Sequence, residues 1–506
     1  MQNNVLDYLP ESVKRVPHKT AFSDGKDSLT FQEVYDQSRS VGTFLYQQGI
    51  YKEPVVIFMN KHPKTVAAFL GVITGGNYYI PIDAEMPEVR IELILKNVKA
   101  RMMICDNDTI TAAREFHFEG QIAAYDDICT VRADAAALQD IYDKAIDTDP
   151  IYIVFTSGST GIPKGVVACH RSVIDYIEQL SEVLEIKEDT VFGNQTPLYV
   201  DACLKEIYPT LKYGAAMYLI PKELFMFPTK LVQFLNENRI NTICWVVSAL
   251  TMISTFGTFK TIVPEHLRLI AFASEVFPIK QFNKWKEALP DARFINLYGP
   301  TEGTGVCCYY VVEREFVPGE VIPIGRPFKN REILLLNEKN ERAGAGENGE
   351  ICIRGTTLTL GYYNNFEKTH EAFVQNPLNP FYPELIYRTG DIGRYNELGE
   401  LEFVSRKDHQ IKHMGHRIEL GEIEVNVNML DEISMAGCIY DDGKGKIVLY
   451  YVGEIDEAGL ISILKEKLPR YMIPNRVIKL EQMPLTMNGK IDRNTLKNEY
   501  QKNTNK

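Results

Sequence analysis

The sequence lacks the features that mark secreted and membrane-spanning proteins. None of its nine cysteines forms a C-x-x-C pair, and their odd number favours free thiols over a disulfide framework. No apolar run approaches the ~20 residues of a membrane span. The start M-Q-N-N-V-L-D has neither the basic residues nor the apolar core of a signal peptide. We therefore expect a cytoplasmic protein with no membrane partner.

A basic surface is also missing. The formal net charge is −12, which argues against a nucleic-acid partner while leaving room for a local basic pocket that binds a nucleotide. The 506 residues exceed the roughly 250–300 that a single core supports, so several subdomains are expected.

A Walker A loop is absent too, because no Gly-Lys-Ser/Thr is present near Gly158 and Pro163 precedes Lys164. What stands there instead is F-T-S-G-S-T-G-I-P-K-G-V (155–166), directly after the strand-like run I-Y-I-V-F. Glycines let backbone N–H groups converge, hydroxyls add donors and the lysine adds charge, so this stretch predicts a phosphate-binding loop. A flexible surface loop is the alternative. The candidate ligands are Thr156, Ser157, Gly158, Ser159, Thr160, Gly161 and Lys164.

Strand and helix patterns alternate over most of the chain. Strand-like V-V-I-F-M (55–59), a helix from Pro63 and strand-like Y-Y-I-P-I (78–82) begin an alternation that predicts parallel α/β layers. After about residue 320, short β-rich pieces between Gly and Asn turns predict a small distorted sheet or barrel. We predict a core domain over 1–404 and a second, mixed domain over 405–506, with a disordered tail from Gln501.

Four later motifs carry residues that suit a phosphate site. N-L-Y-G-P-T-E (296–302) ends in a hydroxyl and a carboxylate, and a carboxylate beside phosphate indicates Mg²⁺. Y-R-T-G-D (387–391) offers Asp391 to vicinal hydroxyls. The basic stretch S-R-K-D-H-Q-I-K-H follows at 405–413, and P-L-T-M-N-G-K (484–490) places Lys490 after a turn. Taken singly, each has an ordinary reading as a turn or a solvated loop.

In this order, the five segments resemble the adenylate-forming (ANL) enzymes, specifically the amino-acid adenylation domains of non-ribosomal peptide synthetases and their stand-alone relatives. The likeness covers nearly the whole chain. It implies an α/β, multi-subdomain fold: a large N-terminal domain of two α/β layered subdomains plus a distorted β-barrel, and a small mobile α+β C-terminal domain.

The resemblance also implies roles for individual residues. The ATP site would consist of the loop residues above together with Asn296, Tyr298, Gly299, Asp391 and Arg406. Tyr298 would stack on adenine and Asp391 would bind the ribose. The catalytic residues would be Thr301, Glu302 and Lys490, with Glu302 also holding Mg²⁺ and Asp408 serving as the hinge of the C-terminal domain.

The implied reaction is ATP-dependent activation of an amino acid, with release of pyrophosphate. Transfer of the aminoacyl group to the phosphopantetheine thiol of a carrier protein would follow. No carrier-like segment follows Lys490, so we expect the carrier to be a separate protein.

The segment Y-V-D-A-C-L-K-E (199–206) lies where the family recognises its substrate. By resemblance, Asp201 would bind the substrate's ammonium group, and the rest of the pocket would be Ala202, Lys205, Cys244, Ala271, Ala273, Leu297, Gly305 and Val306. An unpaired buried lysine is costly, so Lys205 predicts a substrate with an acidic or strongly hydrogen-bonding side chain. Alternatively, Asp201 and Lys205 pair with each other as an exposed i, i+4 pair on a helix.

Three other functions are compatible with parts of the sequence. K-E-I-Y-P-T-L and S-E-V-F-P resemble a D-alanine–carrier protein ligase, although Ala202, Lys205 and Ala273 depart from that subfamily. An acyl-CoA synthetase is opposed by Asp201. A non-catalytic nucleotide-binding scaffold is opposed by the joint presence of Lys164, Glu302, Asp391 and Lys490.

Overall fold

The computed structural model describes residues 2–158, 163–317, 319–407, 410–485 and 491–504. Its contacts divide the chain into two compact units. Unit 1 consists of Met1–Ala84, Val98–Val154 and Gly165–Lys407, and unit 2 of Glu85–Asn97, Phe155–Lys164 and Asp408–Lys506. The predicted hinge Asp408 and the predicted catalytic Lys490 lie outside the described residues.

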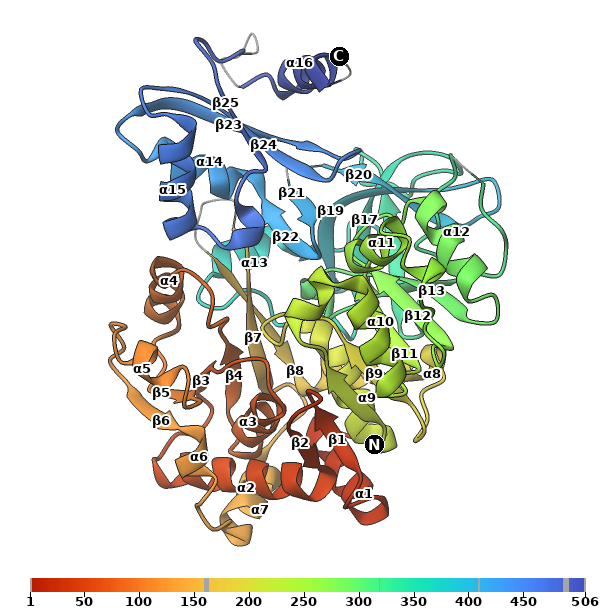
Figure 1. Ribbon diagram of the computed structural model, residues 1–506. Coiled ribbons are helices and arrows are strands. Elements are labelled where there is room, and N and C mark those ends of the chain that lie inside the picture. The colour runs from red at the N-terminus through yellow and green to blue at the C-terminus, as the bar shows by residue number, and fades with distance from the viewer. Residues whose placement is uncertain (1, 159–162, 318, 408–409, 486–490, 505–506) are drawn as a thin grey trace. The chain divides into compact units, whose positions relative to one another are not determined.

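The first half of the chain forms a six-stranded sheet whose first five strands in sheet order are parallel (Figure 1). In sheet order its strands are β6 (Gln121–Ala124), β5 (Met102–Cys105), β3 (Pro54–Phe58), β4 (Tyr78–Pro81), β7 (Pro150–Thr156) and β8 (Lys164–Cys169). β3 and β5 are buried along their whole length, as continuous apolar runs of a sheet covered on both faces require.

The second sheet has nine strands, and its centre is parallel. Its order is β15 (Arg326–Pro327), β14 (Cys308–Val311), β13 (Arg293–Tyr298), β12 (Leu269–Ala273), β11 (Thr242–Val246), β9 (Val191–Asn194), β10 (Ala216–Leu219), β1 (Thr20–Ser23) and β2 (Ser28–Thr30). Together the two sheets confirm the predicted α/β layers.

Helices cover both sheets. In chain order they are α1 (Tyr8–Arg15), α2 (Phe31–Gln47), α3 (Pro63–Thr74), α4 (Glu88–Val98), α5 (Ile110–Ala113), α6 (Tyr125–Ile128), α7 (Ala135–Lys144), α8 (His170–Leu184), α9 (Leu204–Tyr213), α10 (Pro228–Glu237), α11 (Val247–Thr255) and α12 (Ile279–Ala288). The expected strand-to-helix passage at L-T-F-Q-E is confirmed, because Thr30 and Glu33 form a reciprocal capping box at the start of α2.

One core joins the two sheets. Apolar residues of α2, α3, α8 and α9 belong to a single buried cluster that also contains side chains of β3, β7, β9, β12 and β13. A second cluster, centred on Trp245 and Trp285, fills the space between the nine-stranded sheet and helices α10, α11 and α12. The layers predicted from alternation are therefore helices packed between and outside two sheets.

The β-rich region after residue 320 forms an antiparallel sheet. It consists of β16 (Arg331–Leu336), β17 (Gly349–Gly355), β19 (Leu385–Tyr395), β18 (Phe373–Gln375) and β20 (Leu401–Arg406), with α13 (Phe366–Ala372) beside it. Tyr298 at the end of β13 belongs to the same buried cluster as Tyr362 and Tyr387, so this sheet packs against the predicted nucleotide motif.

The C-terminal part of unit 2 is an independent α+β unit with its own core. It contains a hairpin of β21 (Gln410–His413) and β22 (His416–Glu419), and a sheet of β23 (Ile433–Asp441), β24 (Lys446–Gly453) and β25 (Arg476–Lys479). Its helices are α14 (Leu420–Asn428), α15 (Glu457–Lys467) and α16 (Arg493–Thr504). The expectation of a disordered tail from Gln501 was wrong, because α16 continues to Thr504.

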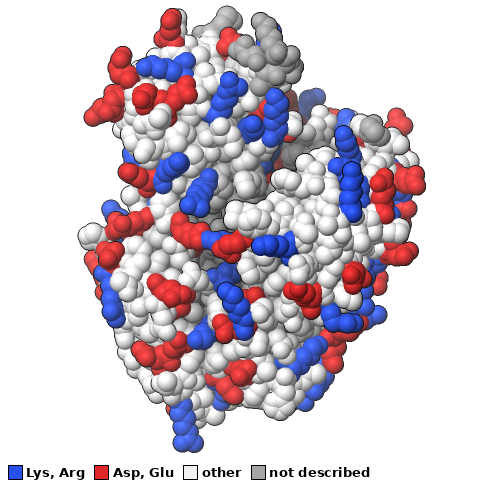
Figure 2. Space-filling view, viewed as in Figure 1, with Lys and Arg blue, Asp and Glu red and all other residues white. Residues whose placement is uncertain are grey.

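Acidic and basic side chains are interspersed over the face shown in Figure 2. No helix among the described residues is long and apolar enough to cross a membrane.

Candidate functional site

The motif that follows β13 is a tight turn packed onto itself. Tyr298 ends the strand, and Thr301–Gly303 form a single 3-10 turn. A Cβ placed on Gly299 would lie 2.5 Å from the carbonyl oxygen of Gly305, so only glycine fits there. The N–H of Cys307 also donates to the Tyr298 carbonyl at 2.7 Å. These contacts place the residues on either side of the turn next to each other.

Asp201 lies against this turn. Its Oδ1 accepts a hydrogen bond from the Thr301 hydroxyl at 3.2 Å, and its Oδ2 accepts one from the Gly305 N–H at 3.2 Å. The carboxylate is buried, and burial raises its pKa above the ordinary value. Two segments about a hundred residues apart in the chain, one predicted to bind the substrate and one predicted to be catalytic, therefore meet at this carboxylate.

Tyr298, Asp391 and Arg406 form a second buried group. The Tyr298 hydroxyl donates to Asp391 Oδ2 at 2.5 Å, and Arg406 Nη1 donates to Asp391 Oδ1 at 2.5 Å. Asp391 and Arg406 face each other across the antiparallel pair β19–β20. The three residues predicted for the adenine and ribose end of ATP thus lie together.

Glu302 is fully buried in the same turn, and its Oε1 accepts a hydrogen bond from the hydroxyl of Tyr362 at 2.7 Å. Sequence analysis missed Tyr362, which lies 60 positions further on in the chain and in no recognisable motif.

Asn296 differs from the expectation that it binds ATP. Its amide N–H₂ binds the carbonyls of Ile322 and Pro323, at 3.3 and 2.8 Å, so these donors hold the following loop instead of a ligand.

The predicted substrate pocket lies on one face of three neighbouring strands. Cys244 on β11 pairs with Ala271 on β12, and Ala273 on β12 pairs with Leu297 on β13. These four residues and Val306 belong to the same buried cluster. Ala202, the chain neighbour of Asp201, is half-buried.

Gly305 borders a residue that sequence analysis missed, Tyr176 on α8. A Cβ on Gly305 would lie 2.6 Å from the Tyr176 ring, and Gly305 has a φ of +79°, which favours glycine. The Tyr176 hydroxyl is buried and has no hydrogen-bond partner among the described residues. Burial raises the pKa of the Tyr176 hydroxyl, and the negative charge of Asp201 raises it further. Tyr176 therefore belongs to the surroundings of this carboxylate.

Lys205 is buried, with 3% of its surface exposed. In the part of the chain that the structure describes, no carboxylate lies within 4.0 Å of its ammonium group, so the alternative of an exposed Asp201–Lys205 pair was wrong. Burial raises the pKa of the neighbouring Glu206 to about 7, while the charges of Lys205 and Lys61 lower it. Glu206, which sequence analysis did not single out, also accepts a hydrogen bond from the Asn194 amide.

The phosphate-loop sequence is described only at its two ends, because Ser159, Thr160 and Gly161 lie outside the described residues. Within unit 2, the Ser157 hydroxyl donates to the Arg417 carbonyl at 2.8 Å, and the Gly158 N–H donates to Glu422 Oε2 at 3.3 Å. Glu422 also forms a buried ion pair with Arg90. Gly158 thus already binds a carboxylate oxygen, which is the behaviour expected of an anion site. Thr156 ends strand β7 before the loop, and Lys164 begins strand β8 after it.

Comparisons with known proteins assign the class and then the family. Solved structures of adenylating enzymes share the fold of this chain. With the Vibrio cholerae adenylation domain AlmE, in complex with glycyl-adenosine-5'-phosphate, the TM-score is 0.85 at 22% identity, over 99% of this chain and 98% of that one. Residues 9–363 match the AMP-binding enzyme family, and the chain belongs to it.

Curated relatives extend the match to nearly the whole sequence. Tyrocidine synthase 1 of Brevibacillus parabrevis is 32% identical over 496 residues, covering 96% of this chain and 44% of the relative. Delta-poly-L-ornithine synthetase of Acinetobacter baumannii is 30% identical over 508 residues, covering 98% and 37%. The chain therefore spans less than half the length of these curated relatives.

Proposed function

We propose that this ligase activates an amino acid with ATP, forming an aminoacyl-adenylate and pyrophosphate, and passes the aminoacyl group to the phosphopantetheine thiol of a carrier protein. The observation that carries the proposal is the buried carboxylate of Asp201. Its hydrogen-bond partners, Thr301 and Gly305, are neutral donors. An unneutralised buried carboxylate is costly, and a substrate ammonium group would offset that cost.

An ammonium bound at Asp201 would place the substrate's carboxylate near the Thr301–Glu302 turn. One oxygen of that carboxylate attacks the α-phosphorus of ATP, and the bond from this phosphorus to the pyrophosphate oxygen breaks. Tyr298, Asp391 and Arg406 would hold the nucleoside. Glu302 suits Mg²⁺, since a fully buried carboxylate beside phosphates is a ligand of the kind this ion takes. When bound, Mg²⁺ would offset the charge on the phosphates.

Lys490 lies outside the described residues, and its role stays a prediction. It would neutralise charge that builds up between the attacking carboxylate and the α-phosphate. Asp408 would be the hinge that removes Lys490 after adenylation.

The charges around the pocket favour an acidic or strongly hydrogen-bonding substrate side chain. Lys205 is a buried cation whose charge lowers the pKa of both Asp201 and Glu206. It has no carboxylate within 4.0 Å among the described residues. A side-chain carboxylate or carbonyl of the substrate near Lys205 would supply the missing partner.

The second step requires a carrier thiol. The thiolate attacks the carbonyl carbon of the adenylate, a thioester forms, and AMP leaves with the electron pair of the broken C–O bond. The similarity to PA1221, whose structure contains adenylation and PCP domains, supports a carrier partner (TM-score 0.82, 23% identity, over 97% of this chain and 84% of that one).

Pyrophosphate exchange against L- and D-amino acids, β-amino acids and dicarboxylic acids tests the proposal. We expect exchange with an acidic or amide-bearing amino acid and none with its des-amino counterpart, for example glutamate against glutarate. Equal exchange with both members of such a pair would contradict the role of Asp201. Acyl transfer to coenzyme A in preference to a holo-carrier protein would identify an acyl-CoA synthetase instead.

A further inference from the structure

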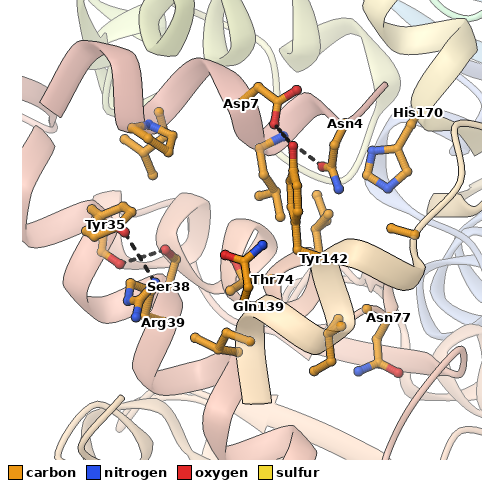
Figure 3. Close-up of a pocket in the computed structure, with 18 of the residues that line it drawn as sticks. Asn4, Asp7, Tyr35, Ser38, Arg39, Thr74, Asn77, Gln139, Tyr142 and His170 are labelled. Carbon is orange, nitrogen blue, oxygen red and sulfur yellow. Dashed lines mark hydrogen bonds between the residues drawn. The ribbon is translucent and has the colours of Figure 1, made fainter. Parts of the chain in front are cut away.

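A cavity lies in unit 1, and none of the residues that line it belongs to the turn that contains Thr301 and Glu302. Its volume is about 380 Å³, and its walls come from helices α1, α2, α3 and α7 together with the first residue of α8. Figure 3 shows it in close-up. Apolar side chains, including Leu9, Ile73, Leu138 and Ile141, line much of it. An apolar cavity with a few polar groups is the usual form of a small-molecule site.

The acidic side chains at the cavity already have partners. Asp7 accepts a hydrogen bond from the Tyr142 hydroxyl at 2.6 Å, Glu11 pairs with Lys14 at 2.7 Å, and Asp149 pairs with Lys52 at 2.9 Å. The lysines offset the charges of Glu11 and Asp149, and the Tyr142 hydroxyl occupies one oxygen of Asp7.

Arg39 is the cation of the lining, and it has no carboxylate within 4.0 Å in the described part of the chain. Its guanidinium donates to the Tyr35 hydroxyl at 3.2 Å and lies 5.2 Å from the centre of the Tyr35 ring. A guanidinium has five N–H donors in a planar fork, and a carboxylate matches that fork. Arg39 therefore favours an anionic ligand.

Two donors lie on the opposite side of the cavity in Figure 3, at Asn4 and His170. Both side chains are more than nine-tenths buried. The N–H of Val5 donates to Nδ1 of His170 at 3.2 Å, so the proton of the neutral ring is on Nε2. Burial lowers the pKa of His170 to about 4, which keeps the ring neutral near pH 7.

These donors have no hydrogen-bond acceptor among the described residues. Asn4 uses its Oδ1 to accept from the N–H of Leu6 at 3.0 Å, which leaves its amide N–H₂ without a partner. The Nε2–H of His170 likewise has no acceptor in the described ranges. An acceptor on a ligand would satisfy both groups.

We propose that this cavity binds an apolar monocarboxylate that carries a carbonyl group at its far end. The carboxylate lies against Arg39, the carbonyl accepts hydrogen bonds from Asn4 and His170, and the hydrocarbon between them packs on Ile73, Leu138 and Ile141. The site is separate from the adenylation site, and the proposal does not depend on which amino acid the ligase activates.

Isothermal titration of the full chain tests this site with three matched probes. γ-Benzoylbutyrate has both groups, δ-phenylvalerate lacks the ketone, and methyl γ-benzoylbutyrate lacks the charge. We expect saturable binding of γ-benzoylbutyrate that is about ten-fold or more tighter than that of either other probe, in line with one charge-assisted contact and one buried hydrogen bond. No saturable heat with any probe, or equal affinity for the acid and its ester, would overturn the proposal.

Variants separate the two ends of the site. Arg39→Gln should reduce the affinity for γ-benzoylbutyrate to that of the ester, whereas Arg132→Gln, at an exposed arginine outside the cavity, should leave it unchanged. His170→Asn keeps an acceptor for Val5 and removes the Nε2–H, so it should reduce the preference for γ-benzoylbutyrate over δ-phenylvalerate, with Asn4 still donating to the ketone. Pyrophosphate exchange by each variant checks its folding. An affinity of the Arg39→Gln variant equal to that of Arg132→Gln would place the bound probe elsewhere and refute the site.

Discussion

Tyr298 and Asp391 share a hydrogen bond of 2.5 Å although 93 positions separate them in the chain. Tyr298→Phe keeps the ring that is proposed to stack on adenine but leaves Asp391 Oδ2 without this donor. We expect the KM for ATP to rise about ten-fold, and the free energy of unfolding to fall by about 1–3 kcal/mol, the range for a lost hydrogen bond to a buried charge. Pyrophosphate exchange and urea unfolding measure the two effects.

The control is Tyr309→Phe on the adjacent strand β14, where the hydroxyl accepts from the exposed Arg326 at 2.9 Å. It should change the KM for ATP little. Equal effects of the two substitutions would show that Asp391 does not depend on Tyr298.

Asp201→Asn replaces a carboxylate with an isostere that retains one acceptor oxygen. Loss of the charge should lower kcat/KM for the amino acid about 100-fold or more, as expected when a buried ammonium loses its partner. The KM for ATP should change little, and the variant should be at least as stable as the original, because burial already raises the pKa of this carboxyl group. If the Asp201→Asn variant keeps the original kcat/KM for the amino acid, Asp201 is not the ammonium ligand.

Lys205→Ala removes the buried cation of the substrate pocket. We expect the ratio of exchange with neutral amino acids to exchange with acidic ones to rise about ten-fold, equivalent to about 1.4 kcal/mol. Lys212→Ala, on the same helix but paired with Glu178 at 2.5 Å, is the matched control. The same ranking of substrates in both variants would refute an acidic side-chain specificity.

Lys164→Ala separates the two half-reactions. If Lys164 grips the pyrophosphate leaving group, kcat/KM for ATP should fall about 10–100-fold, whereas single-turnover thioester formation from a preformed adenylate should be unchanged. Lys64→Ala, which removes an ion pair with Asp126, should leave both half-reactions intact. Equal losses in both steps would assign Lys164 a general structural role.

His170 should make stability depend on pH. Its folded pKa of about 4 lies below the ordinary histidine value of 6.5, so the unfolded chain binds more protons between these values. Stability should therefore be complete above about pH 6.5 and decline as pH falls toward 4, by up to about 3 kcal/mol. Thermal unfolding of His170→Asn should show a shallower dependence over this range. His18→Gln, at an exposed histidine, should reproduce the original pH dependence.

The alternation of apolar runs predicted the layered fold because strands such as β3 and β5 are buried throughout and helices such as α3 begin at marked residues like Pro63. The prediction of disorder from polar composition failed at Gln501–Thr504, because these residues continue α16. Local polarity predicts solvation, and solvation alone does not prevent a helix from extending by one more turn.

One motif contains Thr301 and Glu302, so the sequence alone marked them as candidates, and their catalytic roles stay a prediction. Tyr362, Tyr176 and Glu206 could not be found in this way, because each acts through a contact with a distant or unmarked residue. The burial of Lys205 could not be predicted from the sequence either. The sequence allowed an exposed pair with Asp201, and only packing shows that both side chains are buried and unpaired with each other.

The close approach of the Tyr176 ring to Gly305 constrains how the proposed substrate pocket can be altered. Any side chain introduced at Gly305 would collide with that ring and would also have to adopt a left-handed backbone conformation. Redesign at this point of the pocket must therefore begin at Tyr176. Reducing that ring to a smaller side chain would open a volume that a bulkier substrate can occupy, while the glycine stays in place.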